Sequence, residues 1–388
     1  MSSDKQKIKP FLVFSDDFGE HPSSCQHIFR YISKNHKVLW VNTIGMRNPK
    51  LTLVDLKKSI LKIRKMLIGI FLKTKNVTTS NVNVCQPLML PFPRLRLVRK
   101  INEIFVVRSV QKKLDELFFE KPIIVVTAPN ACDYIGRFKE EKVIYYCVDD
   151  FSEWPGLDRK LVSTMEDNMI TQADRFIATS IDLKKRIEKK GKCVHLLTHG
   201  VDYEHFSKKN DVEHSALINI PKPRIGYFGL FDKRSNIDLI INVAKQLPNV
   251  SFVITGSIEV DKTDLEKIPN IYFTGKIPYT ELPKMASGWD ICMLPYIVNK
   301  LTDAIQPLKI KEYLSTGKPV ISTPIKEAVR LQEYIILASS TQEWVDKIKL
   351  IISGAKNIDM EKRKEFLNNE GWESKSIKFL DICYEDNQ

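Results

Sequence analysis

The residue pair best suited to chemistry lies in the segment 306–319, QPLKIKEYLSTGKP. Pro307 is typical of a first helical turn and Gly317 of a C-terminal cap, which together predict a short helix. Lys309 and Glu312 are three residues apart, so they share one face of it. That face could present an ammonium to a diphosphate and a carboxylate to a pair of sugar hydroxyls. The alternative is an ordinary surface ion pair.

A second candidate is the glycine turn in the segment GYFGLFDKR, which follows a predicted strand. Gly229 would let the backbone approach a ligand closely, and a helix predicted from about Asn236 would offer free N–H groups to a phosphate. Lys233 and Arg234 could add positive charge. The segment is neither Gly-x-Gly-x-x-Gly nor a Walker A sequence, which argues against a nicotinamide enzyme. An ordinary tight turn is the alternative.

Two adjacent carboxylates, Asp149 and Asp150, follow another predicted strand, in YYCVDDFSEWPG. Either could remove a proton from an attacking hydroxyl, an effect of roughly 10²–10⁴ in rate. Either could instead cap the next helix. The residues alone do not decide which of the two would be the base.

A polar loop follows the first predicted strand, in the segment FSDDFGEHPSSCQH. Four of its side chains could line a cleft, or they could cap the helix that follows: Asp16, Asp17, His21 and Ser24. The histidine spacings in the chain suggest no metal cluster. The seven cysteines include no Cys-x-x-Cys pair, so a disulfide framework and a zinc site are both disfavoured and a reducing cytoplasm fits best.

Short β-branched runs that alternate with helical patterns must position these residues. Such alternation predicts an α/β protein with parallel sheets, which bind ligands beyond the carboxyl ends of their strands. A polar, proline-rich stretch predicts a boundary after residue 206, giving domains 1–206 and 207–369, with a final helix at 370–388 joining the first. The predicted strands are 11–14, 38–41, 82–85, 123–127, 143–147, 175–178, 194–197, 224–228, 251–255, 271–274, 291–294, 319–322 and 334–337.

The net charge of +13 belongs to the first half of the chain. Residues 1–200 hold 35 basic and 21 acidic residues, and the excess is concentrated between Arg47 and Lys113. Basic residues there alternate with apolar ones at helical spacing, which predicts contact with an anionic membrane surface. A solvated basic face is the alternative, and no motif for nucleic acid accompanies the charge. The predicted contact residues are Lys57, Lys58, Lys62, Arg64, Lys65, Arg94 and Arg96.

Taken in order, the segments quoted above, together with ADRFIATS and HGVDYEHF, resemble the GT-B glycosyltransferases of the family-4 kind. The chain is most similar to teichuronic-acid-type and capsule-type bacterial enzymes and also to xanthan-type glucuronosyltransferases. The resemblance covers nearly the whole chain. It implies two Rossmann-like domains around a cleft, with a final helix that crosses back to the first domain.

The resemblance also implies roles for the residues. Glu312 would bind the ribose of a nucleotide-diphosphate sugar and Lys309 its diphosphate, with the Gly229 turn and its two basic residues nearby. The N-terminal domain would hold the acceptor, often an undecaprenyl-diphosphate-linked sugar. GT-B enzymes generally need no bound metal, so no cofactor is expected.

The family pattern Glu-x7-Glu has Ala304 in place of its first glutamate. Loss of that carboxylate argues against the retaining family-4 mechanism. The related glucuronosyltransferases are proposed to use an aspartate of the N-terminal domain as the base of an inverting displacement, and Asp149 or Asp150 could fill that role.

The sequence thus predicts a cytoplasmic glycosyltransferase, peripheral on the inner face of the cell membrane. It would transfer a sugar from a UDP-linked donor to a lipid-linked or saccharide acceptor in surface polysaccharide assembly. No run reaches the roughly 18 to 20 apolar residues of a spanning helix, and the first residues show no secretion signal. The rival interpretations are a GT-B sugar-nucleotide epimerase and a peripheral membrane scaffold with an inactive cleft.

Overall fold

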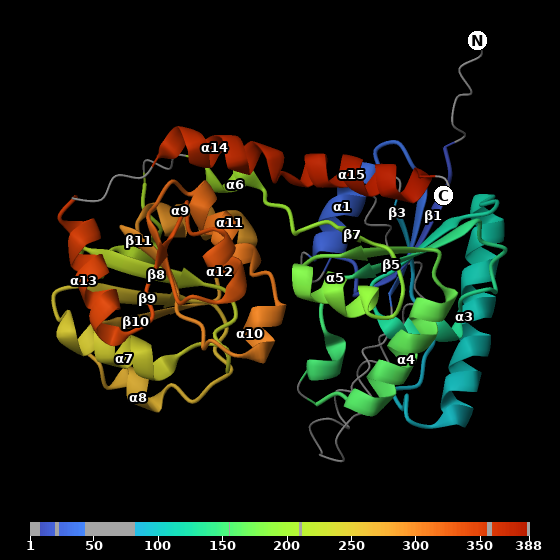
Figure 1. Cartoon of the computed structure of the whole chain (residues 1–388), viewed down its shortest axis with the longest axis horizontal. Helices are drawn as coiled ribbons and strands as arrows, with labels where there is room; N and C mark the ends of the chain where they lie inside the picture. The colour runs from blue at the N-terminus through green and yellow to red at the C-terminus, as the bar shows by residue number, and fades with distance from the viewer. Residues whose placement is uncertain are drawn as a thin grey trace, which may run out of the picture. The chain divides into compact units, whose positions relative to one another are not determined.

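A computed structural model describes residues 8–19, 23–42, 82–154, 156–208, 212–354 and 359–385. The chain forms two compact units, each a parallel sheet with flanking helices (Figure 1). Unit 1 comprises Met1–Thr198 and Trp372–Gln388, and unit 2 comprises His199–Gly371. The predicted α/β class is therefore confirmed, whereas the division between the units comes earlier than residue 206.

The sheet of unit 1 has the strand order β3-β2-β1-β4-β5-β6-β7, and every neighbouring pair is parallel. Its central strands are buried along their whole length, which their β-branched and aromatic residues permit. The strands are β1 (Phe11–Ser15), β2 (Val38–Asn42), β3 (Val82–Cys85), β4 (Ile123–Val126), β5 (Lys142–Cys147), β6 (Arg175–Ala178) and β7 (Val194–Leu196).

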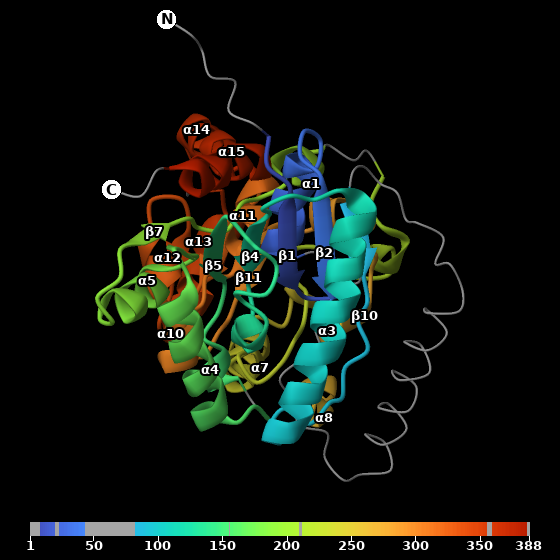
Figure 2. The same ribbon diagram turned by 90° about the vertical axis from the view of Figure 1, so that its right-hand side faces the viewer.

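Unit 1 also has helices that begin at conventional caps. The side chain of Ser23 accepts a hydrogen bond from the Gln26 N–H at the start of α1, and Asp158 and Ser180 cap α4 and α5 in the same way. The longest helix, α3, runs beside the sheet (Figure 2). The helices are α1 (Ser24–Ile32), α3 (Arg96–Leu117), α4 (Arg159–Gln172), α5 (Ile181–Glu188) and α15 (Trp372–Tyr384).

The sheet of unit 2 has the strand order β10-β9-β8-β11-β12-β13 and is likewise parallel throughout. Its strands are β8 (Arg224–Phe228), β9 (Ser251–Thr255), β10 (Ile271–Gly275), β11 (Ile291–Leu294), β12 (Val320–Ser322) and β13 (Ile336–Leu337). Its helices are α6 (Tyr203–Phe206), α7 (Ile237–Gln246), α8 (Thr263–Glu266), α9 (Leu282–Ser287), α10 (Lys300–Ala304), α11 (Leu308–Ser315), α12 (Lys326–Arg330), α13 (Thr341–Ile352) and α14 (Met360–Asn369).

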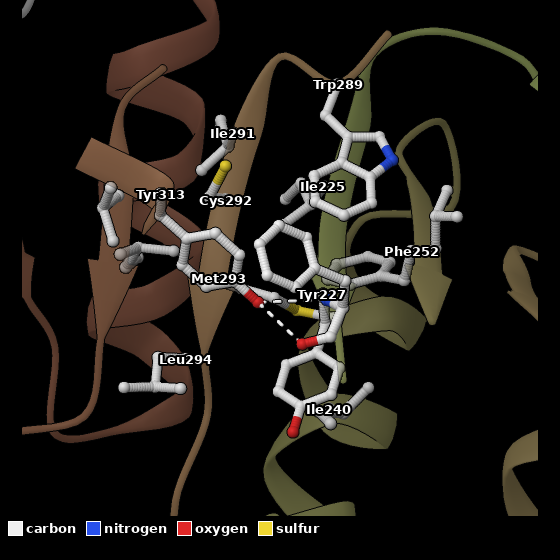
Figure 3. Packing of buried hydrophobic residues seen from close by; sticks show 14 of the residues in the cluster. Ile225, Tyr227, Ile240, Phe252, Trp289, Ile291, Cys292, Met293, Leu294 and Tyr313 are labelled. Carbon is white, nitrogen blue, oxygen red and sulfur yellow. Dashed lines mark hydrogen bonds between the residues drawn. The ribbon is translucent and has the colours of Figure 1, made fainter. Parts of the chain in front are cut away.

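The core of unit 2 is built around the middle of β8 (Figure 3). The indole of Trp289 lies so close to Gly226 that an added Cβ would meet the ring at 1.8 Å, so only glycine fits this position in the strand. Tyr313 of α11 packs edge-on against Phe228, with ring centroids 4.7 Å apart. Its hydroxyl accepts a hydrogen bond from the Phe228 N–H at 3.0 Å. This contact fixes α11 to the end of β8.

Every predicted strand corresponds to an observed one, with ends that differ by at most two residues. The earlier division between the units has a physical cause, because α6 packs on unit 2: the ring of Phe206 stacks on Phe228 at 5.7 Å. The C-terminal segment forms two helices, α14 and α15, and α15 lies within the predicted final helix at 370–388. Helix α15 is part of unit 1, where Trp372 stacks on His27 at 4.6 Å.

Candidate active site

Helix α11 begins directly after Pro307 and ends at Ser315; Thr316 is its C-cap, and Gly317 follows with φ +77°. This is the short, proline-started helix that the sequence predicts. Ile310, Tyr313 and Leu314 are completely buried and hold the helix against the sheet. Lys309 and Glu312 are only partly buried and share a different face. The local sequence therefore fixes which side chains α11 presents beyond the end of β8.

Lys309 lies over the turn that follows β8. Its ammonium is 3.2 Å from the Tyr296 hydroxyl and 5.3 Å from the centre of the Tyr227 ring. Gly229 has φ +118°, and an added Cβ would lie 2.3 Å from the Lys309 Cε atom. Glycine is therefore needed here both for its backbone angle and for the approach of the lysine.

The charge of Lys309 reflects two opposed influences. Burial lowers the pKa of its ammonium, whereas electrostatic interactions with Tyr227 and Tyr296 raise it, and the net direction is upward. Lys309 therefore remains a cation at neutral pH, in surroundings where water screens its charge poorly. A partly buried ammonium at the end of a parallel strand is suited to contact a phosphate.

The two basic residues of the turn differ in their surroundings. Lys233 is exposed. Arg234 is partly buried, lies over the Tyr296 ring and forms an ion pair with Asp232 at 2.8 Å. Because this carboxylate offsets part of its charge, Arg234 adds less positive potential than its type alone suggests. Helix α7 begins at Asn236 as predicted, with Asn236 accepting from the Leu239 N–H.

Glu312 lies on α11 beside Lys309. The pKa of its carboxyl is raised to about 7, chiefly by burial; Lys309 opposes this effect, and the charge of Asp202 adds a smaller upward contribution. Asp202 itself caps α6 by accepting a hydrogen bond from the His205 N–H at 3.1 Å. Glu312 can therefore accept hydrogen bonds from ligand hydroxyls, most strongly when it is ionised.

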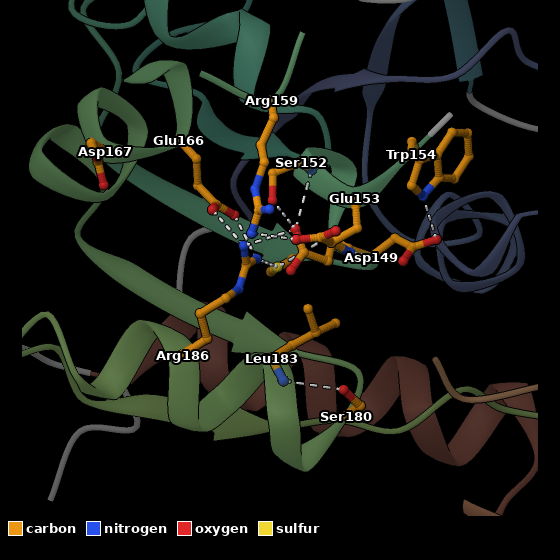
Figure 4. Close-up of polar contacts among 12 residues, drawn as sticks. Asp149, Ser152, Glu153, Trp154, Arg159, Glu166, Asp167, Ser180, Leu183 and Arg186 are labelled. Carbon is orange, nitrogen blue, oxygen red and sulfur yellow. Dashed lines mark hydrogen bonds and ion pairs between the residues drawn. The ribbon is translucent and has the colours of Figure 1, made fainter. Parts of the chain in front are cut away.

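In unit 1, the carboxylates after β5 belong to one polar network (Figure 4). Asp150 accepts hydrogen bonds from the Ser152 N–H at 3.1 Å and the Ser152 hydroxyl at 2.6 Å, and Arg186 donates to the same carboxylate oxygen at 3.1 Å. Asp149 accepts from the Asp150 N–H at 2.7 Å and from the indole N–H of Trp154 at 3.0 Å. Asp150 is thus the residue that caps the next turn.

Arg186 connects this loop to the interior of unit 1. It donates two hydrogen bonds of 2.8 Å to the carboxylate of Glu166, which also accepts from the hydroxyl of the buried Tyr145 at 2.7 Å. The fork geometry suits a guanidinium and a carboxylate. The network therefore holds the Asp150 loop against α4 and α5, and it was not predicted from the sequence.

In the loop after β1, Asp16 organises the start of α1. Its carboxylate accepts from the Ser15 and Ser23 hydroxyls at 2.7 and 3.0 Å and from the Gln26 side chain at 2.9 Å. Ser24 is the first residue of α1 and is buried. The backbone carbonyl of the neighbouring Asp17 accepts from the same Gln26 amide. His21 lies outside the described residues.

Five of the predicted membrane-contact residues lie outside the described ranges, namely Lys57, Lys58, Lys62, Arg64 and Lys65. Arg94 and Arg96 are exposed at the start of α3, where Arg94 pairs with Asp158 at 2.7 Å. Leu97 is 74% exposed, and Ile104 lies on the same side of the helix and is 44% exposed. The start of α3 therefore combines exposed bases with exposed apolar side chains.

Within the described ranges, no helix has both the length and the hydropathy needed to cross a membrane. No group of three or more histidine, cysteine, aspartate or glutamate side chains there could hold a metal ion. The tyrosines that surround Lys309 were not predicted. Tyr296 lies just beyond the carboxyl end of β11, so the rule that ligands bind at such ends could have indicated it.

Comparison with known proteins agrees with this geometry. Residues 222–354 match the family described as Glycosyl transferases group 1, and they lie within unit 2. A protein of Bacillus subtilis (strain 168), whose name assigns it to teichuronic acid biosynthesis as the glycosyltransferase TuaH, is 29% identical over 256 residues. The match covers 60% of this chain and 64% of the relative, so it spans less than two thirds of that protein.

Solved structures share the fold over nearly the whole chain. Sucrose-phosphate synthase from Thermosynechococcus elongatus has a TM-score of 0.70 at 14% identity and covers 96% of this chain and 98% of its own. Anabaena Alr3699/HepE in complex with UDP and glucose has a TM-score of 0.66 at 12% identity, with 97% and 100% covered. The predicted GT-B fold is therefore confirmed, and the predicted similarity to glycosyltransferases agrees with the family match to residues 222–354.

Proposed function

We propose that this chain is a glycosyltransferase that moves a sugar from a UDP-linked donor to a hydroxyl of a lipid-linked or saccharide acceptor in bacterial surface polysaccharide assembly. The observation that carries the proposal is the partly buried Lys309 ammonium over the Gly229 turn, with Glu312 on the same helix face. The family match to unit 2 and the name of the Bacillus subtilis relative support it. So does the UDP in the Anabaena structure.

In this proposal, unit 2 binds the donor. Lys309 contacts the diphosphate and stabilises the negative charge that grows on it as the sugar departs. Glu312 accepts hydrogen bonds from the ribose hydroxyls, and the N–H groups at the start of α7 face the phosphates. None of these steps requires a metal ion.

The contacts in unit 1 favour Asp149 as the base that deprotonates the acceptor. Asp150 already caps a turn and pairs with Arg186, so its carboxylate is engaged in holding the loop. Asp150 would then hold the loop in place while Asp149 takes the proton, which fits an inverting displacement.

Donor binding can be tested by calorimetry with UDP, GDP and ADP. The wild-type chain should bind UDP, and Glu312→Ala should weaken binding by about 10- to 100-fold, because a hydrogen bond to a charged group contributes about 1.5–3 kcal/mol. Glu365→Ala, at an exposed position of α14, is the matched control. Unchanged UDP affinity in Glu312→Ala would remove this residue from the donor site, and no binding of any nucleotide would contradict the proposal.

The choice of base can be tested with Asp149→Asn and Asp150→Asn. UDP release from a UDP-sugar, with a polyprenyl-diphosphate-linked saccharide as acceptor, reports the rate. Asp149→Asn should lower kcat by about 10²–10⁴ while the melting temperature holds. Asp150→Asn should lower the melting temperature and affect kcat less. The reverse order would assign the base to Asp150.

Membrane attachment is the remaining part of the proposal. Exposed Leu97 and Ile104 beside Arg94 and Arg96 suit an interface with anionic lipid, where each base contributes about 1 kcal/mol. Flotation with phosphatidylglycerol vesicles should recover the wild-type chain and recover less of the Arg96→Glu, Leu97→Glu double variant. Changing Lys57, Lys58, Lys62 and Lys65 to Glu tests the remaining bases. Binding that none of these changes reduces would refute the membrane contact.

A further inference from the structure

The chain passes between the two units at two places, after Thr198 and after Gly371. On the unit 2 side these two crossing segments, residues 199–201 and 370–371, lie next to each other. Val201 and Gly371 form a parallel β-bridge, and the Val201 N–H donates to the Glu370 carbonyl at 2.9 Å. The two crossing segments are therefore joined to each other by a β-bridge.

Lys311, a buried residue of helix α11, contacts both crossing segments. The Lys311 side chain is only 3% exposed. Its ammonium donates to the His199 carbonyl at 2.5 Å and forms an ion pair with the Glu370 carboxylate. Lys311 thus contacts both crossing segments at once.

Gln306, just before α11, makes a second tie. Its side-chain carbonyl accepts from the His199 N–H at 2.6 Å, and its amide donates to Glu327 at 2.7 Å. Both backbone polar groups of His199 are therefore bonded to side chains of the segment that carries Lys309 and Glu312. The crossing segments are fixed to the donor-binding helix and not merely to the unit as a whole.

A purely structural role would not require these charges. A buried ion pair gains little over well-packed apolar side chains of similar size, because both ions must be desolvated. Burial indeed lowers the pKa of Lys311, and Glu370 only opposes this effect. What the pair provides is directional contact, since an ammonium can bond a carbonyl and a carboxylate from two different segments together.

We propose that Lys311 is a positioning residue that couples nucleotide binding on one face of α11 to the crossing segments on another. The inference rests on the proposed function, since it takes Lys309 and Glu312 as the nucleotide contacts. The contact of Lys311 with the crossing segments is made by the fold and not by closeness in the sequence, because Glu370 is 59 residues away from it. Loss of the Lys311 ammonium should slow sugar transfer, because transfer needs both units. It should leave the nucleotide affinity unchanged, because nucleotide binding needs only unit 2.

Amide hydrogen exchange tests the coupling in the full chain. In the wild type, UDP should slow exchange of the His199 and Val201 amides about tenfold or more. In Lys311→Met, UDP affinity should stay within about twofold while this protection disappears, and kcat should fall about tenfold without a change in the KM for donor. Lys311→Arg should restore part of the protection, and Lys364→Met, at an exposed position of α14, is the control.

The outcomes separate the two proposals. Equal UDP protection and equal kcat in Lys311→Met and wild type would overturn the coupling, whereas a wild type that binds no nucleotide would overturn the proposed function. In that second case, amide exchange without nucleotide still tests whether Lys311 holds the crossing segments. The His199 and Val201 amides should exchange at least tenfold faster in Lys311→Met than in the wild type. If Lys311→Met does not fold, Lys311→Met with Glu370→Gln removes both charges and is held to the same criteria.

Discussion

Replacing Glu312 with glutamine should stabilise the protein at alkaline pH while weakening nucleotide binding. The carboxyl has its pKa raised from 4.5 to about 7, chiefly by burial. A difference of about 2.5 pH units at about 1.4 kcal/mol per unit corresponds to about 3 kcal/mol. This is the free energy that ionised Glu312 costs the folded state when no ligand is bound.

The sign follows from proton binding. Between pH 4.5 and 7 the folded protein holds the Glu312 proton more tightly than the unfolded chain does, so stability contributed by this group falls as pH rises through that window. Glutamine cannot ionise, and Glu312→Gln avoids the cost. The stability difference between variant and wild type should therefore be small near pH 4.5 and approach about 3 kcal/mol at pH 8.

Scanning calorimetry from pH 5 to pH 8 measures this difference. A change of about 1 kcal/mol shifts the melting temperature of a domain of this size by about 2–4 °C. The melting temperature of unit 2 should therefore be several degrees higher in Glu312→Gln than in the wild type at pH 8. Glu365→Gln, at an exposed position, controls for removal of a carboxylate. A stability difference that is the same at pH 5 and pH 8, or a variant less stable than wild type at pH 8, would refute the reasoning.

Three further changes test the packing around the site. Gly226→Ala places a Cβ 1.8 Å from the Trp289 ring, so it should destabilise unit 2 by more than about 2 kcal/mol in urea unfolding; a loss below 0.5 kcal/mol would contradict this packing. Gly229→Ala, with φ +118° and a Cβ 2.3 Å from the Lys309 Cε, should displace the lysine and abolish UDP binding in calorimetry while lowering stability by only about 1–2 kcal/mol; retained affinity would show that Lys309 is not a ligand. Arg186→Met leaves Glu166 buried without its cation and should cost about 3 kcal/mol in urea unfolding; a loss below 0.5 kcal/mol would contradict this role of the ion pair.

The sequence predicted the elements of the site because their signals are local. Buried strands were recognised from short β-branched runs, and α11 from a proline at its start and Gly317 at its end. The cap of α7 at Asn236 follows the same kind of rule. Each of these features depends on residues within a few positions of one another, and sequence patterns report such relations directly.

The contacts between elements could not be predicted in the same way. Lys309 meets Tyr227 and Tyr296 because β11 lies beside β8, and this strand order skips β9 and β10 in the sequence. Arg186 meets Asp150 across 36 residues, and this pairing is what separates the two adjacent aspartates. Local pattern does not specify such partners, so the sequence leaves the choice between Asp149 and Asp150 open, and Asp149 as the base is a proposal.

Helix α11 shows why residue position matters more than residue type in this protein. Lys309 and Lys311 are two residues apart on eight residues of helix, and burial lowers the pKa of both ammonium groups, yet the net shifts of the two pKa values have opposite directions. Lys309 faces two tyrosines and the turn after β8, where a phosphate could contact its ammonium. Lys311 faces a carbonyl and a carboxylate of its own unit, so its charge is already used within the protein. A ligand with a diphosphate can therefore compete for the first ammonium but not for the second, and only Lys309 should show a changed proton affinity when UDP binds.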